Sequence, residues 1–174
     1  MKKMVLFAMV MAFALSVSAF AEVRIAGLTV SAGAYPGAKG LGIGIVGGLI
    51  NGLNVKNWVS DANAFQFDAN WDLYNGGIGF GVAYLVHNFE IIQADNSKFP
   101  LYFGIKGWGV ITNGSGVITN GNGVAAGISV PIGIAWIPRD VPLDIFLQAE
   151  PGISFIPSVR FSPGGGLGIR FWLN

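Results

Sequence analysis

The sequence predicts an all-β fold, an eight-stranded antiparallel up-and-down transmembrane barrel with a plugged polar lumen. The first observation is a strict alternation of apolar and polar side chains over residues 65–73, which indicates a strand with one apolar and one polar face. The second is composition, since 52% of the residues are hydrophobic and only 11% are charged. The third is that no apolar stretch after residue 21 is long enough for a transmembrane helix. Such a chain can cross a lipid bilayer only as a closed barrel.

Residues 1–21 predict an export signal peptide. Lys2 and Lys3 precede an apolar run over residues 4–15, and Ala19 and Ala21 supply the small residues of an A-x-A cleavage site. We expect cleavage after Ala21, which leaves a nearly neutral chain without a cluster of basic residues. That charge balance argues against a nucleic-acid partner.

The barrel domain is expected over residues 39–174. Residues 22–38 alternate only weakly, and we expect an N-terminal tail there, with an extra strand as the alternative. Eight strands agree with the even strand number of bacterial barrels, and most are close to the 9 to 11 residues that cross a bilayer when tilted. The predicted strands span residues 39–49, 53–60, 64–74, 77–87, 100–110, 123–137, 142–155 and 164–173.

Turn-forming sequences separate these strands. The Asn-Gly pairs at 51–52 and 75–76 favour tight hairpin turns, and 60–63 and 138–142 suit short connections. The three remaining connections, 88–99, 111–122 and 156–163, are longer.

The two faces of the predicted strands differ sharply in charge. One face is almost wholly apolar and is expected to point outward. The opposite face collects most of the charge, which we interpret as a structural ionic network inside the lumen, because buried charges require partners. Its members are Lys56, Asp68, Asp72, Lys106, Asp144, Glu150 and Arg170.

Glycine and the aromatic residues fit the same arrangement. Many glycines share the inward parity, which leaves room in a narrow lumen for large inward side chains. These large side chains are Trp58, Tyr102, Trp108, Phe146 and Trp172. Aromatic residues near strand ends are expected to form girdles at the two lipid interfaces. They are Phe89, Phe99, Trp136, Phe155 and Phe171.

His87 is the one candidate catalytic residue. Glu90 and Ser129 are conceivable partners for an acyl hydrolase, but no nucleophile motif accompanies them. A structural position at the barrel rim is favoured for His87. The sequence contains no cysteine and only one histidine, so no metal site and no cofactor are expected.

Five segments carry a resemblance to known proteins: residues 52–58, 84–89, 101–104, 142–147 and 165–171. With them, the chain resembles a family of uncharacterised small bacterial outer-membrane β-barrel proteins and, more distantly, OmpA/OmpX-type eight-stranded barrels. The resemblance implies a barrel fold and an outer-membrane location, and it brings no catalytic or binding residues.

These observations favour a non-enzymatic barrel of the bacterial outer membrane, with a role in envelope structure or surface interaction. Its expected partners are the lipid bilayer and the outer-membrane assembly machinery, while no specific ligand is indicated. Two alternatives remain open. One is a lipid A-modifying acyl hydrolase or transferase, and the other is a soluble, exported, lipocalin-like binder whose apolar face would point inward.

Overall fold

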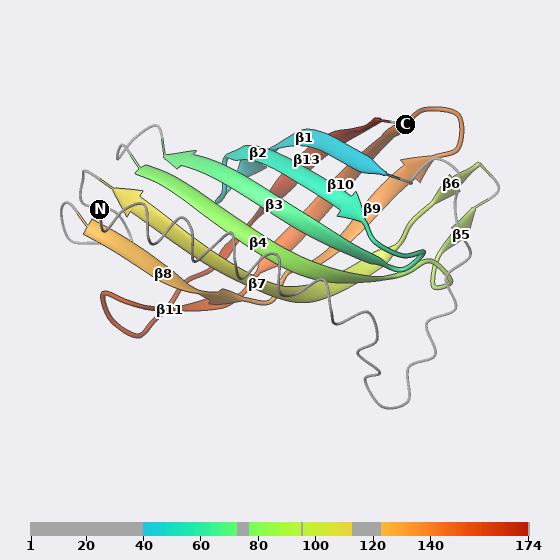
Figure 1. Ribbon diagram of the computed structural model, residues 1–174. Coiled ribbons are helices and arrows are strands. Elements are labelled where there is room, and N and C mark those ends of the chain that lie inside the picture. The colour runs from blue at the N-terminus through green and yellow to red at the C-terminus, as the bar shows by residue number, and fades with distance from the viewer. Residues whose placement is uncertain (1–39, 73–76, 95, 113–122, 174) are drawn as a thin grey trace.

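The computed structural model describes residues 40–72, 77–94, 96–112 and 123–173. The expected signal peptide, the N-terminal tail and the turn at 75–76 lie outside these ranges. Within them, all regular secondary structure is β-strand (Figure 1). No helix with the length and hydropathy to span a membrane occurs in these ranges.

An eight-stranded antiparallel barrel forms the body of the molecule, as predicted. Each strand pairs with the next strand of the barrel along the chain, and the last strand returns to pair with the first. The strands are β1 (Leu41–Gly48), β2 (Gly52–Trp58), β3 (Asn63–Asp72), β4 (Gly77–Asn88), β7 (Leu101–Thr112), β8 (Gly123–Ser129) continued by β9 (Ile132–Pro138), β10 (Leu143–Glu150) and β13 (Gly164–Leu173).

Four shorter strands extend the sheet at the two ends of the barrel. β5 (Gln93–Ala94) and β6 (Ser97–Lys98) form a hairpin that pairs with β9. β11 (Gly152–Ile156) pairs with β8 and with β12 (Arg160–Phe161). Figure 1 shows the β5–β6 hairpin at the right end of the barrel and β11 at the lower left.

Two predicted strands are each interrupted by a proline. The expected strand 123–137 is divided at Pro131, and the expected strand 142–155 is divided at Pro151. Proline has no N–H to donate to a strand ladder, so the regular pairing stops at these positions. Their carbonyl oxygens still accept hydrogen bonds, Pro131 from the Gly104 N–H and Pro151 from the Val130 N–H, both at 2.9 Å.

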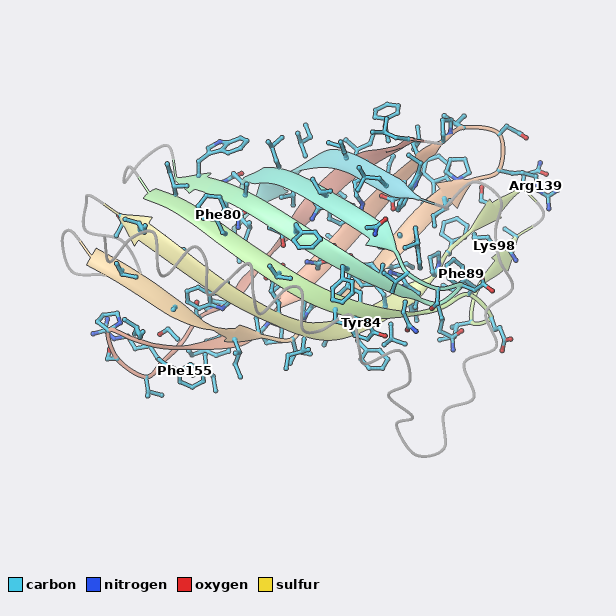
Figure 2. The ribbon with its side chains drawn as sticks, in the orientation of Figure 1. Phe80, Tyr84, Phe89, Lys98, Arg139 and Phe155 are labelled. Atoms are coloured by element: carbon cyan, nitrogen blue, oxygen red, sulfur yellow. The ribbon has the colours of Figure 1, made fainter. Side chains whose placement is uncertain are left out.

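The predicted orientation of β3 is confirmed. Phe67 and Trp71 point outward, and the Phe67 side chain is 39% exposed, whereas Asp68 between them is only 5% exposed. The same alternation places large apolar side chains on the outside of the other barrel strands. Figure 2 shows two of them, Phe80 and Tyr84 of β4.

Large inward side chains lie over glycines of the neighbouring strand. The Trp172 ring covers Gly42, where a Cβ atom would stand 2.8 Å from the ring. Arg170 covers Gly44, and the Phe146 ring covers Gly168 in the same way. A lumen of eight strands is narrow, so a large side chain fits only where the facing residue has none.

The assignment of Phe89 to an outer aromatic girdle was wrong. Phe89 is 4% exposed, and its ring centroid lies 5.8 Å from that of Trp58. β4 ends at Asn88, so the alternation no longer applies at the next residue, and the ring packs over the end of the barrel. Trp136, Phe155 and Phe171 do lie on the exposed exterior.

Replacement of Gly44 by alanine is expected to destabilise the barrel by about 1 to 3 kcal/mol, because the added Cβ would clash with the backbone carbonyl oxygen of Ile169 on β13 and would stand 2.6 Å from the Arg170 Cγ. The measurement is the free energy of unfolding from a urea titration followed by tryptophan fluorescence. Gly107→Ala is the matched control, because a Cβ there meets no atom within 4 Å. Equal effects of the two substitutions would contradict the packing argument.

Candidate functional site: the polar interior of the barrel

The charged side chains inside the barrel form two groups of ion pairs. In the first group, the Lys106 ammonium of β7 contacts Asp68 of β3 at 2.8 Å and Glu150 of β10 at 2.9 Å. All three side chains are almost completely buried. One cation therefore joins three strands that lie on different sides of the barrel.

The second group pairs Arg170 of β13 with Asp144 of β10. The Arg170 Nε donates to the Asp144 carboxylate at 2.8 Å, and neither side chain is exposed. The guanidinium carbon also lies 3.9 Å from the centre of the Phe146 ring, in cation–π geometry. The charge is thus held by a carboxylate on one side and an aromatic face on the other.

Two amides connect the groups. Asn54 donates to Asp68 and accepts from the Arg170 Nη1 at 2.9 Å. Gln66 also accepts from Nη1, at 3.1 Å, and its amide lies 3.4 Å from an Asp68 oxygen. Neither amide was predicted, because the residues expected in the network were all charged. The signal that could have found Asn54 and Gln66 is their parity, because both alternate onto the same inward face as Lys56 and Asp68.

Hydrogen bonds and ion pairs form a circuit around the lumen that begins and ends on β10, whose backbone closes it between Glu150 and Asp144. Gln148 of β10 donates to Glu150 at 2.6 Å and accepts from the Tyr102 hydroxyl of β7 at 2.8 Å. Followed strand by strand, the contacts run from β10 to β7, β3, β2 and β13 and return to β10 at Asp144. These non-covalent contacts connect five strands of the barrel wall to one another through the lumen.

Lys56 does not join the ion pairs. Its Nζ has no hydrogen-bond partner among the described residues and lies 4.8 Å from the centre of the Trp58 ring and 5.0 Å from that of Tyr102. The side chain of Asp72 lies outside the described part of the structure. Of the seven residues predicted for the network, the structure joins five, which are Asp68, Lys106, Asp144, Glu150 and Arg170.

His87 is buried in an aromatic cluster at the end of the barrel. Its Nδ1 lies 3.1 Å from the carbonyl oxygen of Ala62, and its ring centroid lies 4.4 Å from Trp58 and 5.1 Å from Tyr102. The Nε2 has no partner among the described residues.

The structure does not bring His87 together with Ser129 and Glu90. His87 pairs opposite Tyr102 of β7, whereas Ser129 pairs opposite Lys106, four residues along the same strand. That offset corresponds to about 13 Å at the usual rise of a strand. Glu90 is exposed outside the barrel end, where its N–H bonds to Asn88. The described ranges contain no group of three or more histidine, aspartate or glutamate side chains that could hold a metal ion.

Comparison with known proteins finds no match among protein-family models, curated proteins or solved structures. The expected membership of a family of small outer-membrane barrels therefore stays a prediction, while the eight-stranded antiparallel barrel itself is confirmed.

Replacement of Asp144 by asparagine is expected to destabilise the protein by about 3 to 5 kcal/mol, because it leaves the buried Arg170 charge without a carboxylate. The free energy of unfolding in urea measures the effect. Asp140→Asn, the same change at an exposed position between β9 and β10, serves as the control and is expected to change stability little. A similarly small effect at Asp144 would show that the ion pair is dispensable.

Proposed function

We propose that this chain is a barrel of the bacterial outer membrane with a non-enzymatic role, either in the structure of the envelope or in contacts made through its loops. The observation that carries the proposal is the chemistry of the barrel wall, which is apolar on its outside and charged on its inside. The export signal expected at residues 1–21 supports the same location.

The outside of the wall exposes large apolar side chains on every barrel strand. An exterior of this kind is costly in water, because exposed apolar area disfavours the dissolved state by roughly 25 cal/mol per Å². In a membrane, lipid chains cover such an exterior, so no protein partner is needed to remove it from water. The exposed apolar residues of the wall include Ile43, Ile45, Leu53, Phe67, Trp71, Ile78, Phe80, Phe103, Ile105, Val124, Ile128, Ile132, Leu147, Leu167 and Phe171.

Charge on the described surface lies away from this wall. The charged side chains that the structure describes on the eight barrel strands are all buried inside. Exposed charge is found beyond the strand ends, at Asp61, Glu90, Arg139 and Asp140 at one end and at Arg160 at the other. Figure 2 shows Arg139 and Lys98 together at the end that carries the β5–β6 hairpin. A wall without exposed charge, with the exposed charges lying beyond its two ends, matches the apolar layer of a bilayer.

The orientation of the wall also favours the membrane proposal over a lipocalin-like binder. A soluble binder needs its apolar face inside, around the ligand, and its charged face in water. Here Phe67 is exposed, and Asp68 is buried in the hydrogen-bonded circuit. For the enzymatic alternative, the separation of His87 from Ser129 supplies no supporting geometry.

Replacement of Ile105 by arginine is expected to lower the free energy of unfolding in lipid vesicles by about 2 to 4 kcal/mol. This is the cost of placing a basic side chain near the midplane of a bilayer. Ile105 is 60% exposed near the middle of β7. The measurement is denaturant unfolding in vesicles. Val159→Arg is the control, because Val159 is 75% exposed in the connection between β11 and β12. If the wall faced water, neither substitution would change the free energy of unfolding much. That result would contradict the proposal.

Full-length protein expressed in a Gram-negative bacterium is expected to fractionate with the outer membrane. In detergent it should migrate faster on a gel before heating than after, because a barrel with a cross-linked interior stays folded until it is boiled. Membrane fractionation and gels of heated and unheated samples provide the measurement. Recovery of a monomer that stays in solution without detergent would refute the location.

A further inference from the structure

We propose that a buried group of nitrogen donors around Lys56 is a binding site for a small monovalent anion. The group, named here the Lys56 site, consists of Lys56, Trp58, Arg170 and Trp172. It lies at the end of the barrel where β2 and β13 end. The inference goes beyond the membrane proposal and does not depend on it.

β1 brings the four side chains together, because this strand presents glycine to the lumen at the level of the site. Gly42 pairs with Lys56 on one side and with Trp172 on the other. The next inward position, Gly44, pairs with Arg170. Side chains from β2 and β13 therefore reach over β1 toward each other. The ring centroids of Trp58 and Trp172 lie 6.1 Å apart.

Arg170 reaches the immediate surroundings of Lys56. Its Nη1 donates to Asn54, two residues before Lys56 on β2, and to Gln66, which pairs opposite Lys56 on β3. The second terminal nitrogen, Nη2, is left without an acceptor among the described residues. Two cations thus lie in the same section of the lumen.

The donors of the Lys56 site have no acceptor. Lys56 Nζ, Trp58 Nε1, Trp172 Nε1 and Arg170 Nη2 are all buried, and none has a hydrogen-bond partner among the described residues. A buried donor without a partner costs about 1 to 3 kcal/mol, and native proteins contain few of them. Asp144 Oδ2 and His87 Nε2 are also buried without a hydrogen-bond partner, but neither is within hydrogen-bond distance of these four donors. The four donors therefore point to an acceptor that is not part of the polypeptide.

Charge distinguishes an anion from water at this site. Lys106 binds two carboxylates, Asp68 and Glu150, whereas Lys56 and Arg170 have one between them among the described residues, that of Asp144. The Trp58 and Tyr102 rings compensate the Lys56 charge only partly. A water molecule would leave this local excess of positive charge around Lys56 and Arg170 in place, whereas a monovalent anion accepts the donors and balances the charge at the site. Chloride and small carboxylates such as formate share this chemistry.

Chloride NMR tests the site. Full-length protein in detergent, in a buffer whose other anions are bulky sulfonates, is expected to broaden the ³⁵Cl resonance saturably. Lys56→Met should abolish the broadening, because the charge is lost while the length of the side chain is kept. Arg139→Gln, which removes an exposed cation elsewhere, should leave it unchanged.

Trp172→Phe keeps a ring in place and removes one donor. We expect about tenfold weaker chloride affinity, the effect of one hydrogen bond to a charged group. This variant carries the test even where Lys56→Met does not fold. If formate displaces chloride, the site also binds small carboxylates. If formate does not compete, the site is selective for halides. Absence of saturable broadening in the unmodified protein, or equal broadening in Lys56→Met, would overturn the proposal.

Discussion

The Arg170 guanidinium connects the strands on both sides of the seam at which the barrel closes. A closed barrel needs its last strand, β13, to pair with its first, β1, and β1 offers only glycine to the lumen beside Arg170. The arginine uses that space to reach across β1, and it donates to Asn54 of β2 and Gln66 of β3 while its Nε holds Asp144 of β10. The seam between the chain's first and last barrel strands is therefore reinforced by a side chain that binds strands on both sides of it.

Two opposing costs shape the interior. Burying an ion pair removes both charges from water, and the attraction between them offsets this cost only with good geometry and additional hydrogen bonds. Asn54 and Gln148 donate such bonds to the two carboxylates that hold Lys106. Asn54 and Gln66 accept from Arg170. Glycines make the geometry possible, because the large side chains can lie flat against the wall. Packing and electrostatics in this lumen therefore depend on the same few positions.

The two ends of the barrel differ in their chemistry. At one end, Trp58, His87 and Phe89 form an aromatic cluster, and exposed charges lie beyond it. At the other end, the β11–β12 hairpin exposes apolar side chains, among them Phe155 and Phe161. Figure 2 shows Phe155 far from the end that carries Phe89. Such a difference gives each rim of the proposed membrane protein its own contact surface.

The sequence by itself determined which side chains share a face, because the two-residue period of a strand is local. The alternation at Phe67 and Asp68 and the expected space for large inward rings follow from it. It could not determine which base meets which acid, since that depends on the register and tilt of strands distant in the chain. For this reason Lys106 holds two carboxylates, whereas Lys56 holds none among the described residues. The amides of Asn54 and Gln66 become links to Arg170 only in the folded barrel. Phe89 departs from its predicted position for a related reason, because it follows the end of β4, where the alternation ceases and tertiary packing decides where the ring lies.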